Sequence, residues 1–432
     1  MLSAAPMLDQ KDNTSQLRPL VNEHVIDQCV DDTPSLWERH RDAVTQPHYK
    51  LKHLHYLDQR LEAHLQALRT FGSAAWAACD REYSLEDSSH VFTMTAFALF
   101  TDDMERLRRL YAVCQSLPGA QRGMTAAFGW ASGEYLRGVV RQLLASSSAV
   151  ARRIGIAACA IHRVEPGAAL NKALEDPDPP LRARALRAAG QLGQIDLRPL
   201  CVRAAAEEDP AVAFSAAWAA VLLGAESGPL DRLRQFSLAP GPFQDLARPL
   251  TLQALPLAAA AGLLRELTNT GAAVRTVLQG SGLVGDAAYI PWLIHYMQRP
   301  ETARAAGEAF SLITGADITY LDLDRTAPEG LESGPNDDPA DASVAPDPDE
   351  SLPWPDPGLI ETWWSARSHR FQAGTRYFMG EPLNRENCLR VLRVGYQRQR
   401  IAAATYLSLL NPGTSLFEWR APAHRQQRLL AS

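Results

Sequence analysis

The 432-residue chain lacks the features that most directly report a compartment. Its six cysteines form no C-x-x-C pair, and no segment reaches the roughly 18 apolar residues of a membrane span. The N-terminal segment Met1–Gln10 is followed at once by Lys11, so it contains no run of signal-peptide length. We therefore expect a cytoplasmic protein whose cysteines are small buried apolar residues in a reducing compartment.

Motifs for catalysis or metal binding are also missing. The chain has no G-x-S-x-G sequence, and the glycine-rich segment Gly280–Gly285 carries no lysine and follows no predicted strand. The densest histidine group, His53, His55 and His64, does not have the spacing of metal ligands. We expect a protein that is not an enzyme and that has no cofactor and no metal.

Lysine is scarce, with 4 among the 43 basic residues, and the net charge is −6. This balance argues against a protein that binds nucleic acid or membranes through its overall charge. A hydrophobic content of 46% is ordinary for a globular protein.

What the chain does contain is a repeat of 31 residues. Four segments align at that step: 120–129, 151–160, 182–191 and 213–222. Alanine occupies one phase, at Ala127, Ala158, Ala189 and Ala220. Apolar residues occupy another phase, at Val150, Leu181, Val212, Phe243 and Val274. A repeat this short buries its hydrophobic face only by stacking on its neighbours, so we predict an all-α solenoid.

Composition divides the chain into five regions. We expect a disordered N-terminus (1–20), an N-terminal helical cap (21–72), a repeat solenoid (73–316), an acidic proline-rich linker (317–357) and a basic aromatic C-terminal helical segment (358–432). The linker carries eleven acidic residues against one basic residue between Asp322 and Asp356, so it is expected to stay extended unless something orders it.

Local patterns predict individual helices within these regions. The segment Asp31–Pro34 is typical of a helix start. An amphipathic helix is expected next, with leucines at three- and four-residue steps: Leu51, Leu54, Leu57, Leu61, Leu65 and Leu68. In the C-terminal region we predict helices over Leu359–Ser368 and Asn384–Leu410.

The clearest repeat combines an Asp-Pro turn, an alanine-rich first helix carrying Arg182, the turn residue Gly193 and a leucine-rich second helix. This pattern resembles HEAT-like repeats of the phycobilisome-lyase type over about residues 90–316. The resemblance implies that Asp178, before the first helix, pairs with Arg182. It also implies that the second helices line the concave face.

Motifs spread over nearly the whole chain resemble an uncharacterised proteobacterial family. They are Tyr56–Leu65, Phe310–Gly315, Gly334–Asp338, Leu352–Pro355, Gly395–Arg400 and Arg420–Leu429. Members of that family tend to be encoded within type VI secretion gene clusters. The resemblance implies a cytoplasmic accessory and assigns no catalytic residue.

Two sets of residues are candidates for partner binding. Cations recur at the 31-residue step on the second helices, at Arg141, Lys172, Arg203, Arg234 and Arg265. They are expected to form a stripe along a concave groove that holds an acidic protein segment, although cations near helix C-termini also complement the helix dipole. The chain's own acidic linker is a further possible occupant of this groove.

The second set lies in the C-terminal region: Trp363, Trp364, Tyr396, Arg398 and Arg400. Aromatic and arginine side chains are favoured as anchors at protein interfaces. They also serve as stacking platforms for nucleic acid, or as the core of a small helical cap.

These observations favour a non-catalytic scaffold that binds a protein, as an accessory of a type VI secretion system that holds an effector, a spike component or a loading factor. An alternative is an immunity protein that neutralises a co-encoded toxin. A third hypothesis is a DNA-binding HEAT-like protein, which the net negative charge disfavours.

Overall fold

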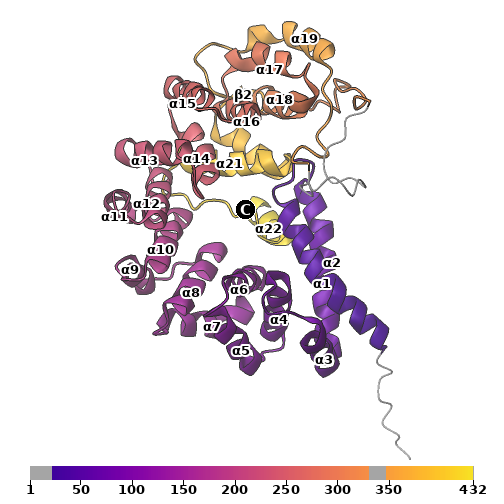
Figure 1. The fold of residues 1–432 in the computed structure, drawn as a ribbon, viewed down its shortest axis with the longest axis vertical. Helices are drawn as coiled ribbons and strands as arrows, with labels where there is room; N and C mark the ends of the chain where they lie inside the picture. The colour runs from indigo at the N-terminus through magenta and orange to yellow at the C-terminus, as the bar shows by residue number, and fades with distance from the viewer. Residues whose placement is uncertain (1–21, 330–346, 432) are drawn as a thin grey trace, which may run out of the picture.

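A computed structural model describes residues 22–329 and 347–431. Within these residues the chain forms 22 α-helices, three short 3-10 helices and one two-stranded hairpin, so the predicted all-α solenoid is confirmed (Figure 1). The expected disordered N-terminus (1–20) and residues 330–346 of the linker lie outside the described part.

The N-terminal region contains α1 (Glu23–Ala43), α2 (Leu51–Phe71) and α3 (Ser73–Glu82). All six leucines of the predicted stripe are buried in α2. The helix start predicted at Pro34 is wrong, because α1 continues through this residue. Proline removes the bond to the carbonyl four residues earlier, and that carbonyl, of Val30, instead accepts from the Tyr83 hydroxyl at 2.6 Å.

The repeat array runs from α4 to α18 as pairs of a first and a second helix. The first helices are α4 (Ser88–Phe100), α6 (Pro118–Trp130), α8 (Ala149–His162), α10 (Pro179–Leu192), α12 (Pro210–Leu222), α14 (Gln244–Ala254), α16 (Val274–Val284) and α18 (Pro300–Thr314). The second helices are α5 (Met104–Cys114), α7 (Gly133–Ala145), α9 (Ala168–Leu174), α11 (Arg198–Ala204), α13 (Ser227–Leu238), α15 (Leu257–Asn269) and α17 (Ile290–Tyr296), with the 3-10 turns η1 (Ile195–Leu197) and η2 (Ala287–Tyr289) before α11 and α17.

The first helices line the inner side of the arch and the second helices lie outside it (Figure 1). Successive first helices pack directly on one another, and small residues allow this close approach. The four alanines of the repeat are fully buried. A Cβ added at Gly190 of α10 would lie 2.8 Å from the Cα of Ala219 in α12. The apolar phase fades at the end of the array, where Val274 is 41% exposed.

The C-terminal segment, residues 347–431, contains α19 (Pro357–Ser365), η3 (Ser368–Arg370), the hairpin β1 (Tyr377–Phe378) and β2 (Glu381–Pro382), α20 (Arg385–Val394), α21 (Gln397–Leu410) and α22 (Ala423–Ala431). The continuous helix predicted over 384–410 is therefore wrong. It breaks at Gly395, and Tyr396 starts α21 anew by donating its N–H to the Gln399 side chain at 3.0 Å.

This segment returns along the inside of the arch and contacts the ends of the first helices (Figure 1). Backbone N–H groups of Tyr377 and Met379 donate to the carbonyls of Gly285 and Leu312, each at 2.7 Å. The Leu416 N–H donates to Gln191 at 3.0 Å. The last carbonyls of a helix have no partner within it, so these bonds satisfy groups that burial would otherwise leave unpaired.

Two arginines extend the same pattern. Arg376 donates to the carbonyls of Leu255 at 2.5 Å and Gln253 at the end of α14. Arg425 donates to Gly129 near the end of α6 at 2.8 Å. Donors from the C-terminal segment thus reach the ends of α6, α10, α14, α16 and α18.

The segment also joins the two ends of the arch. Asp58 of α2 bonds His40 of α1 at 2.6 Å and accepts the N–H of Ala423, at the start of α22, at 2.5 Å. Gln397 of α21 donates its N–H to the Tyr49 carbonyl at 2.8 Å. The N-terminal helices and the end of the array are therefore held together through the C-terminal segment.

All six cysteines are free and buried, as the sequence predicted. Burial raises the pKa of Cys79, Cys114, Cys201 and Cys388 to about 12, so these thiols stay protonated and act as apolar side chains. In the described parts of the chain no helix is both long and apolar enough to cross a membrane.

A substitution at Gly285 tests the contact between the array and the C-terminal segment. Its φ is +74°, and an added Cβ would lie 2.2 Å from the Tyr377 carbonyl oxygen. Gly271 has a similar φ of +80° with nothing within 4 Å of such an atom. We expect Gly271→Ala to lower the free energy of unfolding by about 1–2 kcal/mol and Gly285→Ala by roughly 2–5 kcal/mol, measured by urea unfolding. Equal losses would mean that the segment does not contact Gly285 in solution.

Candidate functional site

A cleft of about 680 Å³ opens on the inner side of the arch. Its walls come from α1, α6, α8, α10 and residues 418–425 of the C-terminal segment. Apolar side chains form much of the lining: Trp37, Val44, Pro118, Ala126, Trp130, Ile154, Ala157 and Ile161. Cavities of this size, mostly apolar with a few polar groups, are typical of ligand-binding sites. We call it the inner cleft.

The inner cleft is strongly cationic. Seven arginines line it: Arg41, Arg122, Arg153, Arg184, Arg187, Arg420 and Arg425. Glu418 is the one carboxylate among its lining residues. Four of the arginines, Arg153, Arg184, Arg187 and Arg425, are half-buried, and because arginine is rarely buried without a counter-charge, this excess favours an anionic ligand.

Three of these arginines repeat at the 31-residue step, on successive first helices. Arg122 and Arg153 are the fifth residues of α6 and α8, and Arg184 is the sixth residue of α10. Arg122 is exposed, while Arg153 and Arg184 are half-buried. Arg153 donates to Gln121, and Arg184 donates to Gln191 at 2.8 Å. We call these three residues the inner ladder.

Burial disfavours the charged form of the deeper arginines. The Arg184 Nε atom is buried and has no hydrogen-bond partner among the described residues. Arg187 stacks on the Trp218 ring, with its guanidinium carbon 3.9 Å from the ring centroid. Desolvation lowers the pKa of Arg184 to about 10, and desolvation together with neighbouring arginines lowers the pKa of Arg187 to about 9. Both stay charged at neutral pH, so a bound anion would relieve this penalty.

Glu418 holds the wall of the inner cleft. Its carboxylate lies 3.3 Å from Arg163, with the two side chains 11% and 15% exposed. Arg163 also donates to the Leu416 carbonyl at 2.6 Å. Glu418 attracts Arg184, Arg187 and Arg425 as well and so raises their pKa against the effect of burial. The C-terminal segment therefore contributes one carboxylate, that of Glu418, to the arginines of the inner cleft.

The predicted cation stripe lies on the other side of the arch. Arg141, Lys172, Arg203, Arg234 and Arg265 lie on α7, α9, α11, α13 and α15, which are outer helices (Figure 1). The expectation that second helices line the concave face is wrong here, because the alanine-rich first helices pack closest and take the inner side. We call these five residues the outer ladder. Four are exposed, and Arg234 pairs with Glu266.

The predicted C-terminal patch is not a continuous surface. Arg400 is fully buried and donates to the Leu392 carbonyl at 2.7 Å and to Gln426 at 2.5 Å, so it offers nothing to a partner. Arg398 pairs with Glu308 at 2.9 Å. Tyr396 is half-buried, with the Lys50 nitrogen 4.2 Å from its ring centroid.

The two tryptophans of the patch pack on the end of the array. The Trp363 ring lies 5.7 Å from that of Phe310, and the Trp364 ring lies 5.0 Å from that of Phe371. Both are half-buried, so they act in part as the core of this region.

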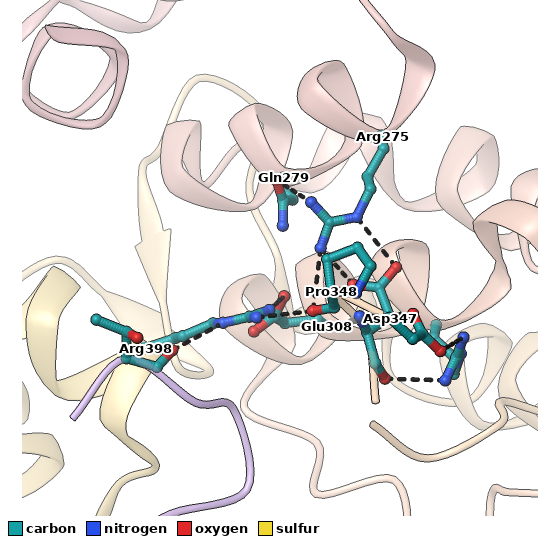
Figure 2. Close-up of polar contacts among 9 residues, drawn as sticks. Arg275, Gln279, Glu308, Asp347, Pro348 and Arg398 are labelled. Atoms are coloured by element: carbon teal, nitrogen blue, oxygen red, sulfur yellow. Dashed lines mark hydrogen bonds and ion pairs between the residues drawn. The ribbon is translucent and has the colours of Figure 1, made fainter. Parts of the chain in front are cut away.

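The acidic linker does bind its own chain, but away from both ladders. Asp347 pairs with Arg304 of α18 at 2.5 Å, and Asp349 pairs with Arg275 of α16 (Figure 2). The implied pair between Asp178 and Arg182 is also replaced. Asp178 caps α10 by accepting the Leu181 N–H at 2.8 Å, and Arg182 pairs with Glu207.

Sequence reasoning missed the inner ladder although the signal was present. Arginine is the third residue of three aligned segments, 120–129, 151–160 and 182–191. Both helices of the repeat carry cations at the same period. The period alone therefore does not say which set lines the cleft.

Removal of the Glu418 charge should destabilise the protein. We expect Glu418→Gln to lower the free energy of unfolding by roughly 2–4 kcal/mol, because Arg163 then keeps its charge in a buried site without a carboxylate. The matched control is Glu266→Gln, which breaks a pair whose side chains are 41% and 44% exposed, and should lose less than about 1 kcal/mol. Urea unfolding of both variants measures the difference, and similar losses would contradict the buried pairing.

Comparison with known proteins identifies one part of the chain. Residues 167–243 match the family model of HEAT repeats, and they span α9 to α13. No curated protein and no solved structure matches the chain. This match supports HEAT-like repeats over α9 to α13, within an all-α solenoid that continues on both sides of them.

Proposed function

We propose that this protein is a non-catalytic scaffold that captures an acidic segment of a partner protein in the inner cleft. The observation that carries the proposal is the charge of the cleft: seven arginines and one carboxylate around an apolar floor. HEAT repeats generally mediate contacts between proteins, and an extended concave surface is how repeat proteins hold their partners.

The partner class follows from the resemblance of the sequence motifs to a family encoded within type VI secretion clusters. We propose that the protein acts in the cytoplasm and that the partner is an effector, a spike component or a loading factor of such a system. The alternative of an immunity protein uses the same cleft but requires that the partner be a toxin that the complex neutralises.

Capture of the partner should depend on the inner ladder and not on the outer one. We expect Arg122→Glu with Arg153→Glu to lower recovery of the partner at least tenfold, because two like charges then face the acidic segment in a partly desolvated cleft. Arg141→Glu with Lys172→Glu makes the same charge change on the outer helices and should change recovery less than twofold.

The measurement is affinity capture from a nuclease-treated native extract, read by mass spectrometry, with the melting temperature of each variant as a folding control. A partner captured equally by both double variants would remove the inner cleft from the proposal. Growth rescue from the captured protein, expressed alone in the cytoplasm, would select the immunity function, whereas a secretion component without toxicity would select the scaffold.

A further inference from the structure

The chain already shows how its first helices bind an acidic segment. Residues 347–349, Asp-Pro-Asp, form a turn in which the Asp349 N–H donates to the Asp347 carboxylate at 2.9 Å, and they place one aspartate against each of two neighbouring first helices (Figure 2). Asp347 pairs with Arg304 of α18 at 2.5 Å, and Asp349 accepts from the Arg275 Nε of α16 at 3.1 Å. Asp349 is 5% exposed. Two carboxylates at alternate positions are thus enough to span two helices of this array.

The proline between them suits a surface of arginines. The Pro348 carbonyl accepts from Arg275 at 3.3 Å and from Arg398 at 3.0 Å. Guanidinium groups only donate hydrogen bonds, and proline has a carbonyl but no N–H. An Asp-Pro-Asp segment therefore offers acceptors and no proline N–H that would be left unpaired. Proline also reduces the conformational entropy lost on binding.

The inner ladder also places arginines on neighbouring first helices, and one of the two arginines that bind the linker shares its position. Arg304 is the fifth residue of α18, the position that Arg122 and Arg153 hold in α6 and α8. Arg304 is paired. In contrast, none of the three inner-ladder arginines forms an ion pair with a residue in 22–329 or 347–431.

The spacing sets the length of a matching ligand. Packed helices lie about 8–10 Å apart, so the three inner-ladder positions span roughly 16–20 Å. In residues 347–349 two carboxylates at alternate positions already reach arginines on two neighbouring helices, because the long arginine side chains cover the distance. Three carboxylates at alternate positions therefore match three helices, whereas a single phosphate group is too small to contact all three.

We propose that the inner ladder binds a proline-containing segment of the partner that carries acidic residues at alternate positions, Asp-x-Asp-x-Asp. This inference rests on the proposed function and specifies the chemistry of the bound segment. The three carboxylates pair with Arg122, Arg153 and Arg184, one on each first helix.

Binding of labelled peptides to the full-length protein tests the spacing. The probe is Gly-Ser-Asp-Pro-Asp-Pro-Asp-Ser-Gly, and its control is the isomer Gly-Ser-Asp-Asp-Asp-Pro-Pro-Ser-Gly, which has the same charge and composition. We expect the spaced peptide to bind at least tenfold more tightly by fluorescence anisotropy at 0.15 M salt, a difference of about 1.4 kcal/mol. Arg122→Glu with Arg153→Glu should raise its Kd at least tenfold, and Arg141→Glu with Lys172→Glu less than twofold.

Three results would overturn the inference: equal binding of the two isomers, equal weakening by the two double variants, or displacement of the peptide by oligothymidine at lower concentration than by unlabelled peptide. Capture of the native partner separates the two levels of the argument. If that capture depends on Arg122 and Arg153 while the isomers bind equally, the spacing rule fails and the proposed function stands. If capture is also independent of these arginines, both fail.

Discussion

The carbonyl groups at the ends of the first helices are the constraint on which the rest of the structure depends. An α-helix leaves its last four carbonyls without an internal partner. Here the C-terminal segment reaches the ends of α6, α10, α14, α16 and α18 and supplies N–H groups from its backbone and from Arg376 and Arg425. The array and the segment therefore stabilise each other, and closure of the arch through α22 follows from the same contacts.

The same constraint contributes to the positive charge at and beside the inner cleft. Donors that reach several carbonyls at once are most readily supplied by arginine, which has five N–H groups and no acceptor. Arg163 donates to the Ala160 carbonyl at the end of α8, and Arg425 donates to the Gly129 carbonyl near the end of α6. Glu418 pairs with Arg163 and attracts Arg425. The inner ladder adds three more cations beside them without added carboxylates. A structural requirement thus supplies part of the field that an acidic ligand experiences.

The sequence predicted the solenoid because stacking of identical units imposes a period, and the buried alanines at 127, 158, 189 and 220 confirm it. It did not predict the direction of curvature, which depends on how closely particular residues such as Gly190 and Ala219 approach in space. The sequence therefore favoured the outer ladder as the candidate site, whereas the cleft in the structure is lined by the inner ladder. Arg400 shows a second limit. Its type suggests a surface, but its partner Gln426 lies 26 residues away, where no local pattern reveals it.

The two ladders recur at the same 31-residue step, so solvent exposure and not sequence period decides which of them binds an acidic segment more strongly. Charges on exposed outer helices interact through water and are screened over about 8 Å at physiological salt. Charges in a partly desolvated cleft interact in an effective dielectric nearer 20 than 80, so each contact is roughly four times stronger. Arg184 and Arg187 are already partly buried by folding, with the Arg184 Nε atom buried and unpaired among the described residues, and this burial lowers their pKa. An acidic segment that enters the cleft meets arginines such as Arg153 and Arg184 that folding has already partly dehydrated, and this favours the inner ladder over an outer one of similar charge.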